Sequence, residues 1–251
     1  MAGAALPNAF MAQHWEAEDG ISPYVTPECW VGGAVAYLLM TQVLKRAMER
    51  RPAMGLQNVM RVYNAAQVVV NAYIVWLLSG EHMLPNLFGI NKPYSDGTRY
   101  AVFLHYCCKF VDFLDTVFIL LRKKDAQFSF LHVYHHSTIG IMWGFLLNIG
   151  HGNGSASFGA WINSLVHVVM YSHYFYTSFG FKNPLKPLIT KFQIVQFYLC
   201  LLHVLVFLAM ETVVPTQLGY LQFAYHVTMV GLFTQFYKKS YSKSVKSVKS
   251  T

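Results

Sequence analysis

Charged side chains are scarce in this chain of 251 residues, since Asp, Glu, Lys and Arg make up 12% of it and hydrophobic residues 55%. A soluble domain carries about 25% charged residues, so the composition excludes a soluble domain with a single anchor. Several apolar stretches approach the roughly 20 residues needed to cross a bilayer. We expect an all-α, polytopic membrane protein with seven transmembrane helices. These predicted spans are 29–44, 58–79, 99–121, 129–150, 156–179, 188–210 and 217–237.

Proline is absent from the middle of every predicted span. All nine prolines lie in or beside the predicted loops, as expected for a residue that removes a backbone donor and disfavours a helical residue before it. The chain then divides into a lumenal segment (1–27), a transmembrane domain (28–237) and a basic tail (238–251). We expect no regular structure in the tail, which would lie near the anionic cytosolic leaflet.

Acidic residues are few, 11 against 19 Lys and Arg, and the net charge is +8. This excess does not indicate nucleic-acid binding, because the basic residues gather in alternate loops and in the tail. The positive-inside rule places those loops in the cytosol. The sequence therefore predicts a lumenal N-terminus and a cytosolic C-terminus, as an odd number of spans requires.

Cysteine is also sparse, and its spacing indicates no framework. The four residues, Cys29, Cys107, Cys108 and Cys200, form no CxxC pair; Cys29 begins the first predicted span and the other three lie inside predicted spans. We expect no structural disulfide. Residues 1–20 mix polar, acidic and apolar side chains and do not resemble a cleavable signal peptide.

Three histidines stand out at the start of the fourth predicted span, in the sequence HVYHH. His132, His135 and His136 are spaced i, i+3 and i+4 and therefore share one helical face. Three imidazoles are costly to leave unpaired in apolar surroundings. The pattern indicates a reaction site, with a hydrogen-bonded cluster between packed helices as the structural alternative.

A second polar face runs along the third predicted span. His105, Lys109, Asp112 and Thr116 are spaced i, i+4, i+7 and i+11, with Asp115 at the edge of the face. Two carboxylates and a lysine inside a membrane must pair or face water. A purely structural ion pair is the alternative, although it would not need the histidine and the second carboxylate.

The fifth and sixth spans add polar residues toward the same side of the membrane. On the fifth, residues three or four positions apart share a face, and Gln193 and Gln196 lie near the start of the sixth. Hydrogen bonds between helices are the structural alternative. The face on the fifth span consists of Asn163, His167, Met170, Tyr171 and Tyr174. Together these faces predict a site at one mouth of an apolar tunnel, for a substrate with a polar activated head and a long hydrocarbon tail.

Three functions are compatible with these features. In acyl transfer, a histidine acts as nucleophile or general base, and Cys107 or Cys108 is a second candidate nucleophile. HxxHH also occurs in the histidine boxes of membrane di-iron desaturases and hydroxylases, but here there is a single box and the other histidines are scattered. A seven-helix receptor or transporter has the same number of spans, although it does not require catalytic side chains gathered at one membrane face.

The chain resembles the ELO family of very-long-chain fatty acid elongases, the membrane 3-ketoacyl-CoA synthases. The resemblance covers about residues 30–237 and is specific because four motifs occur in the family's order. They are KFVDFLDT (109–116), LHVYHH (131–136), NSLVHVVMYSHY (163–174) and TKFQIVQF (190–197).

The resemblance implies that six of the seven helices enclose an acyl tunnel in the endoplasmic reticulum membrane. It implies condensation of a fatty acyl-CoA with malonyl-CoA to a 3-ketoacyl-CoA two carbons longer, with release of CO2 and CoA. No bound cofactor and no metal are expected. The chain has no dinucleotide fingerprint, so a separate ketoacyl reductase, dehydratase and enoyl reductase are implied as partners. Membrane lipids are expected around the helices, and a homodimer is compatible with the resemblance.

The resemblance also implies catalytic roles. His135 is the candidate nucleophile that takes the acyl group, with His167 acting beside it. His132 and His136 would orient the site and assist proton transfer or decarboxylation. We assign substrate binding to the remaining polar residues of the motifs, namely Lys109, Asp112, Asp115, Asn163, Tyr171, Tyr174, Gln193 and Gln196.

Some positions depart from the family's pattern. Asp112 stands where the family usually has glutamate, and His173 where it usually has tyrosine. The C-terminus has Lys249 but no dilysine retrieval signal. FLHVYHHSTIG (130–140), with Tyr134, resembles the polyunsaturated branch found in algae, protists and lower plants. We therefore expect an 18- or 20-carbon polyunsaturated acyl-CoA as substrate.

Overall fold

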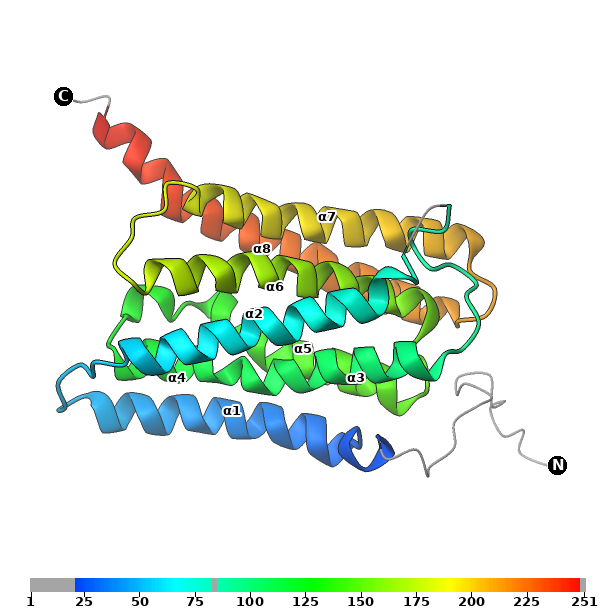
Figure 1. Cartoon of the computed structure of the whole chain (residues 1–251), viewed down its shortest axis with the longest axis horizontal. Helices are drawn as coiled ribbons and strands as arrows, with labels where there is room; N and C mark the ends of the chain where they lie inside the picture. Colours follow the sequence, from blue (N-terminus) through cyan, green and yellow to red (C-terminus); the bar gives the residue numbers. More distant parts are fainter. Residues whose placement is uncertain (1–20, 83–84, 249–251) are drawn as a thin grey trace.

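The computed structural model describes residues 21–82 and 85–248, and every regular element in this part of the chain is helical (Figure 1). Short 3-10 turns cover Ser22–Tyr24, Asp125–Gln127 and Gly154–Ala156. The α-helices are α1 (Pro27–Met48), α2 (Gln57–Ser79), α3 (Asp96–Val111), α4 (Phe113–Leu121), α5 (Phe130–Asn148), α6 (Ser157–Thr177), α7 (Lys186–Met210) and α8 (Thr216–Val248). Because α3 and α4 follow one another as a single interrupted span, the prediction of seven spans is confirmed. Most of the predicted lumenal segment lies outside the described residues.

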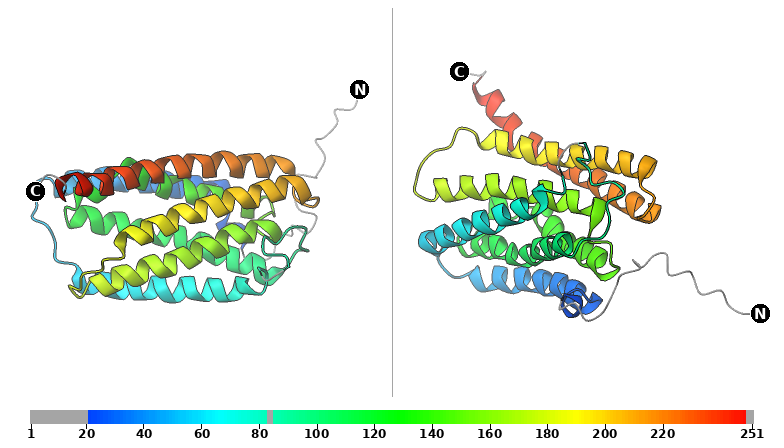
Figure 2. Two further views of the ribbon diagram at one scale, coloured as in Figure 1. Left: turned by 90° about the horizontal axis from the view of Figure 1, so that it is seen from above. Right: turned by 45° about the vertical axis from the view of Figure 1, so that its right-hand side comes forward.

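Six of the spans form a closed ring. Going round it, α2 packs on α3, α3 on α5, α5 on α8, α8 on α7, α7 on α6, and α6 again on α2. The first helix, α1, lies outside this ring against α4 and α5 (Figures 1 and 2). Figure 1 also shows that α1 begins and α8 ends at opposite ends of the bundle, as an odd number of spans requires.

The third span is interrupted at Asp112, inside its polar face. Asp112 keeps a helical φ of −61°, but its ψ of −16° is that of a tighter turn. The next backbone hydrogen bond accordingly spans three residues and not four: the Asp115 amide donates to the Asp112 carbonyl at 3.1 Å. The Tyr63 hydroxyl of α2 reaches the Val111 carbonyl at 3.5 Å. A side chain from a neighbouring helix thus meets a backbone group that the interruption exposes.

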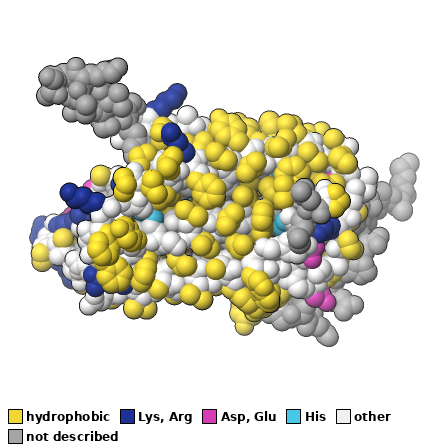
Figure 3. Space-filling view, turned by 45° about the horizontal axis from the view of Figure 1, so that its top comes forward, with side chains coloured by type: hydrophobic (Ala, Val, Ile, Leu, Met, Phe, Trp, Pro, Cys, Tyr) yellow, Lys and Arg dark blue, Asp and Glu magenta, His cyan; other side chains and the backbone are white. Residues whose placement is uncertain are grey.

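The outer surface is apolar along the helices and basic at one end. Figure 3 shows hydrophobic side chains over the middle of the visible face and Lys and Arg mainly at the end where α8 leaves the bundle. By length and composition, α2 and α7 each could cross a membrane. We call the end that carries the α1–α2, α4–α5 and α6–α7 connections the basic end. Its Lys and Arg residues include Arg50, Arg51, Arg122, Lys123 and Lys182.

The last helix corrects the prediction that the chain from residue 238 onward has no regular structure. Instead, α8 continues to Val248 and projects past the other helices (Figures 1 and 2). The sequence from 232 to 248 contains neither proline nor glycine, the two residues that most disfavour a helix interior. The apolar pattern ends near residue 237, but nothing local ends the helix there.

The connection between α2 and α3 covers the end of the bundle opposite the basic end. The His82 ring lies 3.0 Å from the Leu87 carbonyl through Nδ1 and 3.0 Å from the Ser157 hydroxyl through Nε2. Farther along, the Asn91 side chain donates to the Met210 carbonyl at 2.8 Å. These bonds attach the connection to both α6 and the end of α7.

The buried ring of His82 makes the stability of this connection depend on pH. Burial, aided by the nearby charge of Lys92, lowers the His82 pKa from 6.5 to about 4. Between these values the unfolded chain binds a proton that the folded protein does not, so stability is lost as the pH falls from about 6.5 to 4. The loss approaches about 3 kcal/mol.

We expect the thermal unfolding midpoint of the detergent-purified protein to fall between pH 7 and pH 4.5. His82→Gln should show a smaller fall, because glutamine does not titrate. Equal pH slopes for the two proteins would contradict this assignment.

Candidate active site

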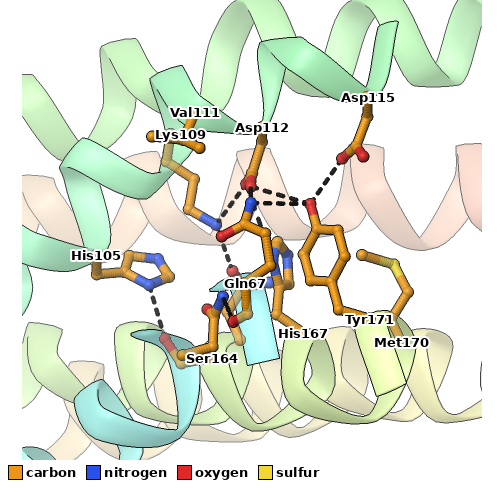
Figure 4. Close-up of polar contacts among 12 residues, drawn as sticks. Gln67, His105, Lys109, Val111, Asp112, Asp115, Ser164, His167, Met170 and Tyr171 are labelled. Atoms are coloured by element: carbon orange, nitrogen blue, oxygen red, sulfur yellow. Dashed lines mark hydrogen bonds and ion pairs between the residues drawn. The ribbon is translucent and has the colours of Figure 1, made fainter. Parts of the chain in front are cut away.

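Four side chains from three helices converge on Asp112, which is 2% exposed (Figure 4). Gln67 Nε2 of α2 donates to Asp112 Oδ1 at 2.5 Å, and the Tyr171 hydroxyl of α6 donates to the same oxygen at 3.0 Å. Lys109 Nζ of α3 donates to Oδ2 at 3.3 Å, and His167 Nδ1 of α6 lies 3.8 Å from Oδ2. Both carboxylate oxygens are therefore satisfied, as a buried charge requires.

Lys109 connects this carboxylate to a second group of polar residues. Its side chain is fully buried and donates from Nζ to Asn163 Oδ1 at 3.0 Å. Asn163 Nδ2 in turn donates to Gln196 Oε1 of α7 at 3.3 Å. A chain of bonds thus runs from Asp112 through α3 and α6 to α7, and the Gln196 Nε2 group has no protein partner among the described residues.

Tyr171 lies between the two carboxylates of the third span. Its hydroxyl is 3.0 Å from Asp112 Oδ1 and 2.6 Å from Asp115 Oδ2. A phenol has one hydrogen and can donate it to only one of them at a time. The Tyr63 hydroxyl lies 3.3 Å from that of Tyr171, and Gln67 Nε2 lies within 3.2 Å of both. The site therefore holds a hydrogen that two acidic groups compete for.

The three histidines of HVYHH form one patch beside this network. The ring centroids of His132 and His136 are 4.3 Å apart, and those of His135 and His136 are 5.4 Å apart with the rings nearly perpendicular. His132 Nε2 is 2.7 Å from the Thr116 hydroxyl, which is 3.0 Å from the Tyr37 hydroxyl of α1. The prediction that the three histidines share one face is confirmed. His132 is held by Thr116 of α4, which in turn contacts Tyr37 of α1.

A cavity adjoins the patch on one side. His135, Asn163 and Gln196 line it near the polar network, and its middle is lined by apolar side chains of α5, α7 and α8. Its lining comes from α5 to α8 and the connections between them. Of the three patch histidines, His135 lines the cavity. These positions bring a nucleophilic residue type, amide groups and an apolar space together.

Most predicted site residues lie in the network or at the cavity, but two lie elsewhere. Gln193 Nε2 contacts the Met170 sulfur at 3.4 Å and does not line the cavity. Tyr174 is 40% exposed, one turn from Tyr171. His173, to which the sequence assigned no role, has its Nδ1 2.7 Å from the Asn183 side chain in the α6–α7 connection. A part for Gln193 and Tyr174 in substrate binding stays a prediction.

The residues of α2 that belong to the network have only a weak signal in the sequence. Asn64, Gln67 and Asn71 share a face of an apolar helix and are all buried, a pattern that also fits hydrogen bonds between helices. Tyr63 is not distinguished in the sequence, since a tyrosine near a helix end is usually read as a membrane-interface residue. The part that Tyr63 and Gln67 play in the network follows only from their contacts in the structure.

The four cysteines are free thiols. Within residues 21–82 and 85–248, which the structure describes, no group of three or more His, Cys, Asp or Glu side chains is arranged to hold a metal ion.

Two polar residues of α2 allow the contribution of the network to the stability of the fold to be measured. Gln67→Leu removes a donor to a buried carboxylate, and we expect it to destabilise the protein by about 1–3 kcal/mol. Asn64→Leu is the matched control, because Asn64 is equally buried and its Nδ2 has no hydrogen-bond partner. That change should be neutral or stabilising. Thermal unfolding of both variants in detergent measures the difference, and equal midpoints would contradict the role of Gln67.

Comparisons with known proteins show the family to which the chain belongs. Residues 23–249 match the model of the "ELO: GNS1/SUR4 family". The chain is 42% identical over 229 residues to fatty acid elongase 5 of Trypanosoma cruzi, covering 91% of this chain and 90% of that protein. It is 42% identical to fatty acid elongase 5 of Leishmania major, covering 91% and 92%. It is 34% identical to very long chain fatty acid elongase 2 of Mus musculus, covering 83% and 74%. The chain therefore belongs to the ELO family and is a multi-pass membrane fatty acid elongase, a 3-ketoacyl-CoA synthase.

Proposed function

We propose that this elongase condenses an 18- or 20-carbon polyunsaturated fatty acyl-CoA with malonyl-CoA, and that His135 carries the acyl group between two half-reactions. Family membership accounts for the condensing step and for the two CoA substrates without a bound cofactor. It leaves no place for the alternatives of a di-iron oxygenase and a receptor or transporter. The observation that carries the proposal is the position of His135, which lines the cavity and whose ring lies against that of His136.

In the first half-reaction, a nitrogen lone pair of neutral His135 attacks the thioester carbonyl carbon. A C–N bond forms, the C–S bond breaks, and CoA leaves as a thiolate that takes up the imidazole proton. His136, whose ring lies against that of His135, and His132, held by Thr116, orient the nucleophile. The product is an acyl-imidazole, which is a good acyl donor.

In the second half-reaction, malonyl-CoA loses CO2 and its enolate carbon attacks the acyl carbon. A C–C bond forms, the C–N bond to His135 breaks, and the departing ring nitrogen takes up a proton from solvent, which restores neutral His135 as the 3-ketoacyl-CoA is released. The thioester and enolate oxygens need hydrogen-bond donors while they carry negative charge. Gln196 Nε2 suits this role, because it lines the cavity near His135 and lacks a protein partner in the described chain.

The Asp112 network positions the second histidine. His167 lies 3.8 Å from Asp112 Oδ2, which Lys109 also contacts. In our proposal this ring stays beside the reacting carbons and moves protons during the exchange. Asp112 and Lys109 hold it in place, while Tyr171 and Asp115 complete the hydrogen bonds behind them.

The remaining features of the proposal rest on the sequence and on the charge distribution. The HVYHH motif with Tyr134 supports a polyunsaturated substrate. The concentration of Lys and Arg at the basic end supports a cytosolic position for that end and a lumenal N-terminus. In the endoplasmic reticulum membrane, separate reductases and a dehydratase would complete the cycle.

The covalent step is tested by intact mass measurement of protein incubated with a 20-carbon polyunsaturated acyl-CoA alone. We expect a mass gain of one acyl group in the wild type and none in His135→Ala. His173→Ala is the matched control and should keep the adduct, since His173 faces Asn183 and not the cavity. Peptide mapping should place the adduct on His135 and not on Cys107 or Cys108.

A wild type that gains no mass, yet forms 3-ketoacyl-CoA once malonyl-CoA is added, would remove the covalent step. A saturated 20-carbon acyl-CoA processed as fast as the polyunsaturated one would remove the substrate preference.

Two glutamines on α7 test the oxyanion role. Gln196→Leu should lower kcat by about 10²–10³, the usual cost of losing one such donor. Gln193→Leu should change kcat little, because Gln193 contacts Met170 outside the cavity, and any part that it has in substrate binding would appear in KM. Both are measured as 3-ketoacyl-CoA formation by purified protein. Equal effects of the two changes would contradict the assignment to Gln196.

A further inference from the structure

The second carboxyl group of the Asp112 network, that of Asp115, has no cation beside it. Asp112 has the Lys109 ammonium group 3.3 Å from its Oδ2, whereas Asp115 forms no ion pair with any Lys, Arg or His of the described residues. Asp115 is also largely shielded from water. If ionised, it would hold a second negative charge against that of Asp112 with only a phenol group between them, which is costly inside a membrane protein. The charges therefore favour a neutral Asp115.

The hydrogens available between the two carboxyl groups lead to the same state. The Tyr171 oxygen lies 3.0 Å from Asp112 Oδ1 and 2.6 Å from Asp115 Oδ2 (Figure 4). Both oxygen–oxygen distances are those of hydrogen bonds, so each contact needs a hydrogen between its two atoms. The phenol supplies only one. The second hydrogen therefore has to lie on one of the two carboxyl groups.

Asp112 is the ionised member of this pair. Lys109 Nζ donates to its Oδ2 at 3.3 Å and Gln67 Nε2 to its Oδ1 at 2.5 Å, and a cation is best placed against a carboxylate that is charged. Asp112 then accepts the Tyr171 hydrogen as well, and the remaining hydrogen belongs to Asp115. The bonds have one direction: Asp115 donates to Tyr171, and Tyr171 donates to Asp112.

This direction affects the position of His167. Its Nδ1 is buried, lies 3.8 Å from Asp112 Oδ2 and has no hydrogen-bond partner among the described residues. The ring therefore depends on where the Asp112 carboxylate lies. An ionised Asp115 would draw the Tyr171 hydrogen to itself and leave Asp112 Oδ1 facing the lone pairs of the Tyr171 oxygen. The carboxylate would move away from that contact, and its distance to His167 would change.

We propose that Asp115 is a neutral carboxylic acid in the working enzyme and that it acts as a positioning residue for His167, through Tyr171 and Asp112. Its effect on the rate rests on the proposed function, in which His167 moves protons. The hydrogen of Asp115 itself stays in the bond to Tyr171 throughout the reaction. The two aspartates of KFVDFLDT thus have different states, one charged beside Lys109 and one neutral behind Tyr171.

Infrared spectroscopy of the purified full chain tests the protonation of Asp115, at neutral pH and in a detergent without carbonyl groups. A carboxylic acid absorbs at a higher C=O frequency than a carboxylate or an amide, and its band shifts when D2O replaces H2O. We expect such a band in the wild type and its loss in Asp115→Asn. Asp125→Asn is the matched control and should keep the band, since Asp125 is exposed in the α4–α5 connection.

Kinetics of 3-ketoacyl-CoA formation test the positioning role. The amide group of Asp115→Asn can donate to Tyr171 as a neutral acid does, whereas Asp115→Leu has a similar size and cannot. We expect kcat of the asparagine variant to exceed that of the leucine variant by about tenfold, as for the loss of one hydrogen bond. KM should be equal in the two, because Asp115 does not line the cavity. In a Tyr171→Phe background, which lacks the connecting hydroxyl, the two values of kcat should be the same.

A wild type without the acid band, or a band that survives in Asp115→Asn, would show that Asp115 is ionised and overturn the inference. Equal kcat for the two variants with Tyr171 intact would overturn the positioning role. The spectrum decides the first question even where leucine prevents folding. An elongase that forms no adduct on His135 would refute the proposed function but not this inference, since neither measurement depends on which residue takes the acyl group.

Discussion

The site depends on one buried ion pair, Lys109 with Asp112. Two opposite charges withdrawn from water are tolerated only when their remaining hydrogen-bonding capacity is satisfied, and here the neighbouring helices supply the partners. Gln67 and Tyr171 complete the carboxylate, and Asn163 completes the ammonium group. Meeting these requirements brings α2, α3, α6 and α7 to defined positions. The same bonds that neutralise the pair thus hold Gln196 at the edge of the cavity, and His167 lies beside the carboxylate.

The ring of six helices is divided in function. The carboxylate network lies between α2, α3, α4 and one face of α6, whereas the cavity lies between α5, α6, α7 and α8. His135, Asn163 and Gln196 lie at the boundary. A polar, rigid half is suited to hold charges in place, and an apolar half is suited to hold a hydrocarbon chain. The proposed reaction takes place where the two meet.

The sequence predicted the features that depend on local pattern. Apolar run length located the seven spans, and helical spacing placed His105, Lys109, Asp112 and Thr116 on one buried face. It did not predict features that depend on partners from other helices. The rotation of neighbouring helices determines three such features: the interruption at Asp112, the contacts of Gln67, and the positions of Gln193 and Tyr174 away from the cavity. The continuation of α8 was missed for the opposite reason, since a change of composition was mistaken for the end of a helix.

The position of α1 outside the ring has a consequence for the evolution of the protein. Its buried residues Ala34, Tyr37 and Thr41 form a narrow inner stripe, and Tyr37 alone among them bonds to the site, through Thr116. A side chain at Gly33 would meet the Phe110 ring at 2.3 Å. Substitutions in this helix are therefore expected to be costly along that strip of small and hydroxyl-bearing residues. On the opposite face, where Val35, Leu39 and Val43 are exposed, we expect apolar residues to replace one another at little cost.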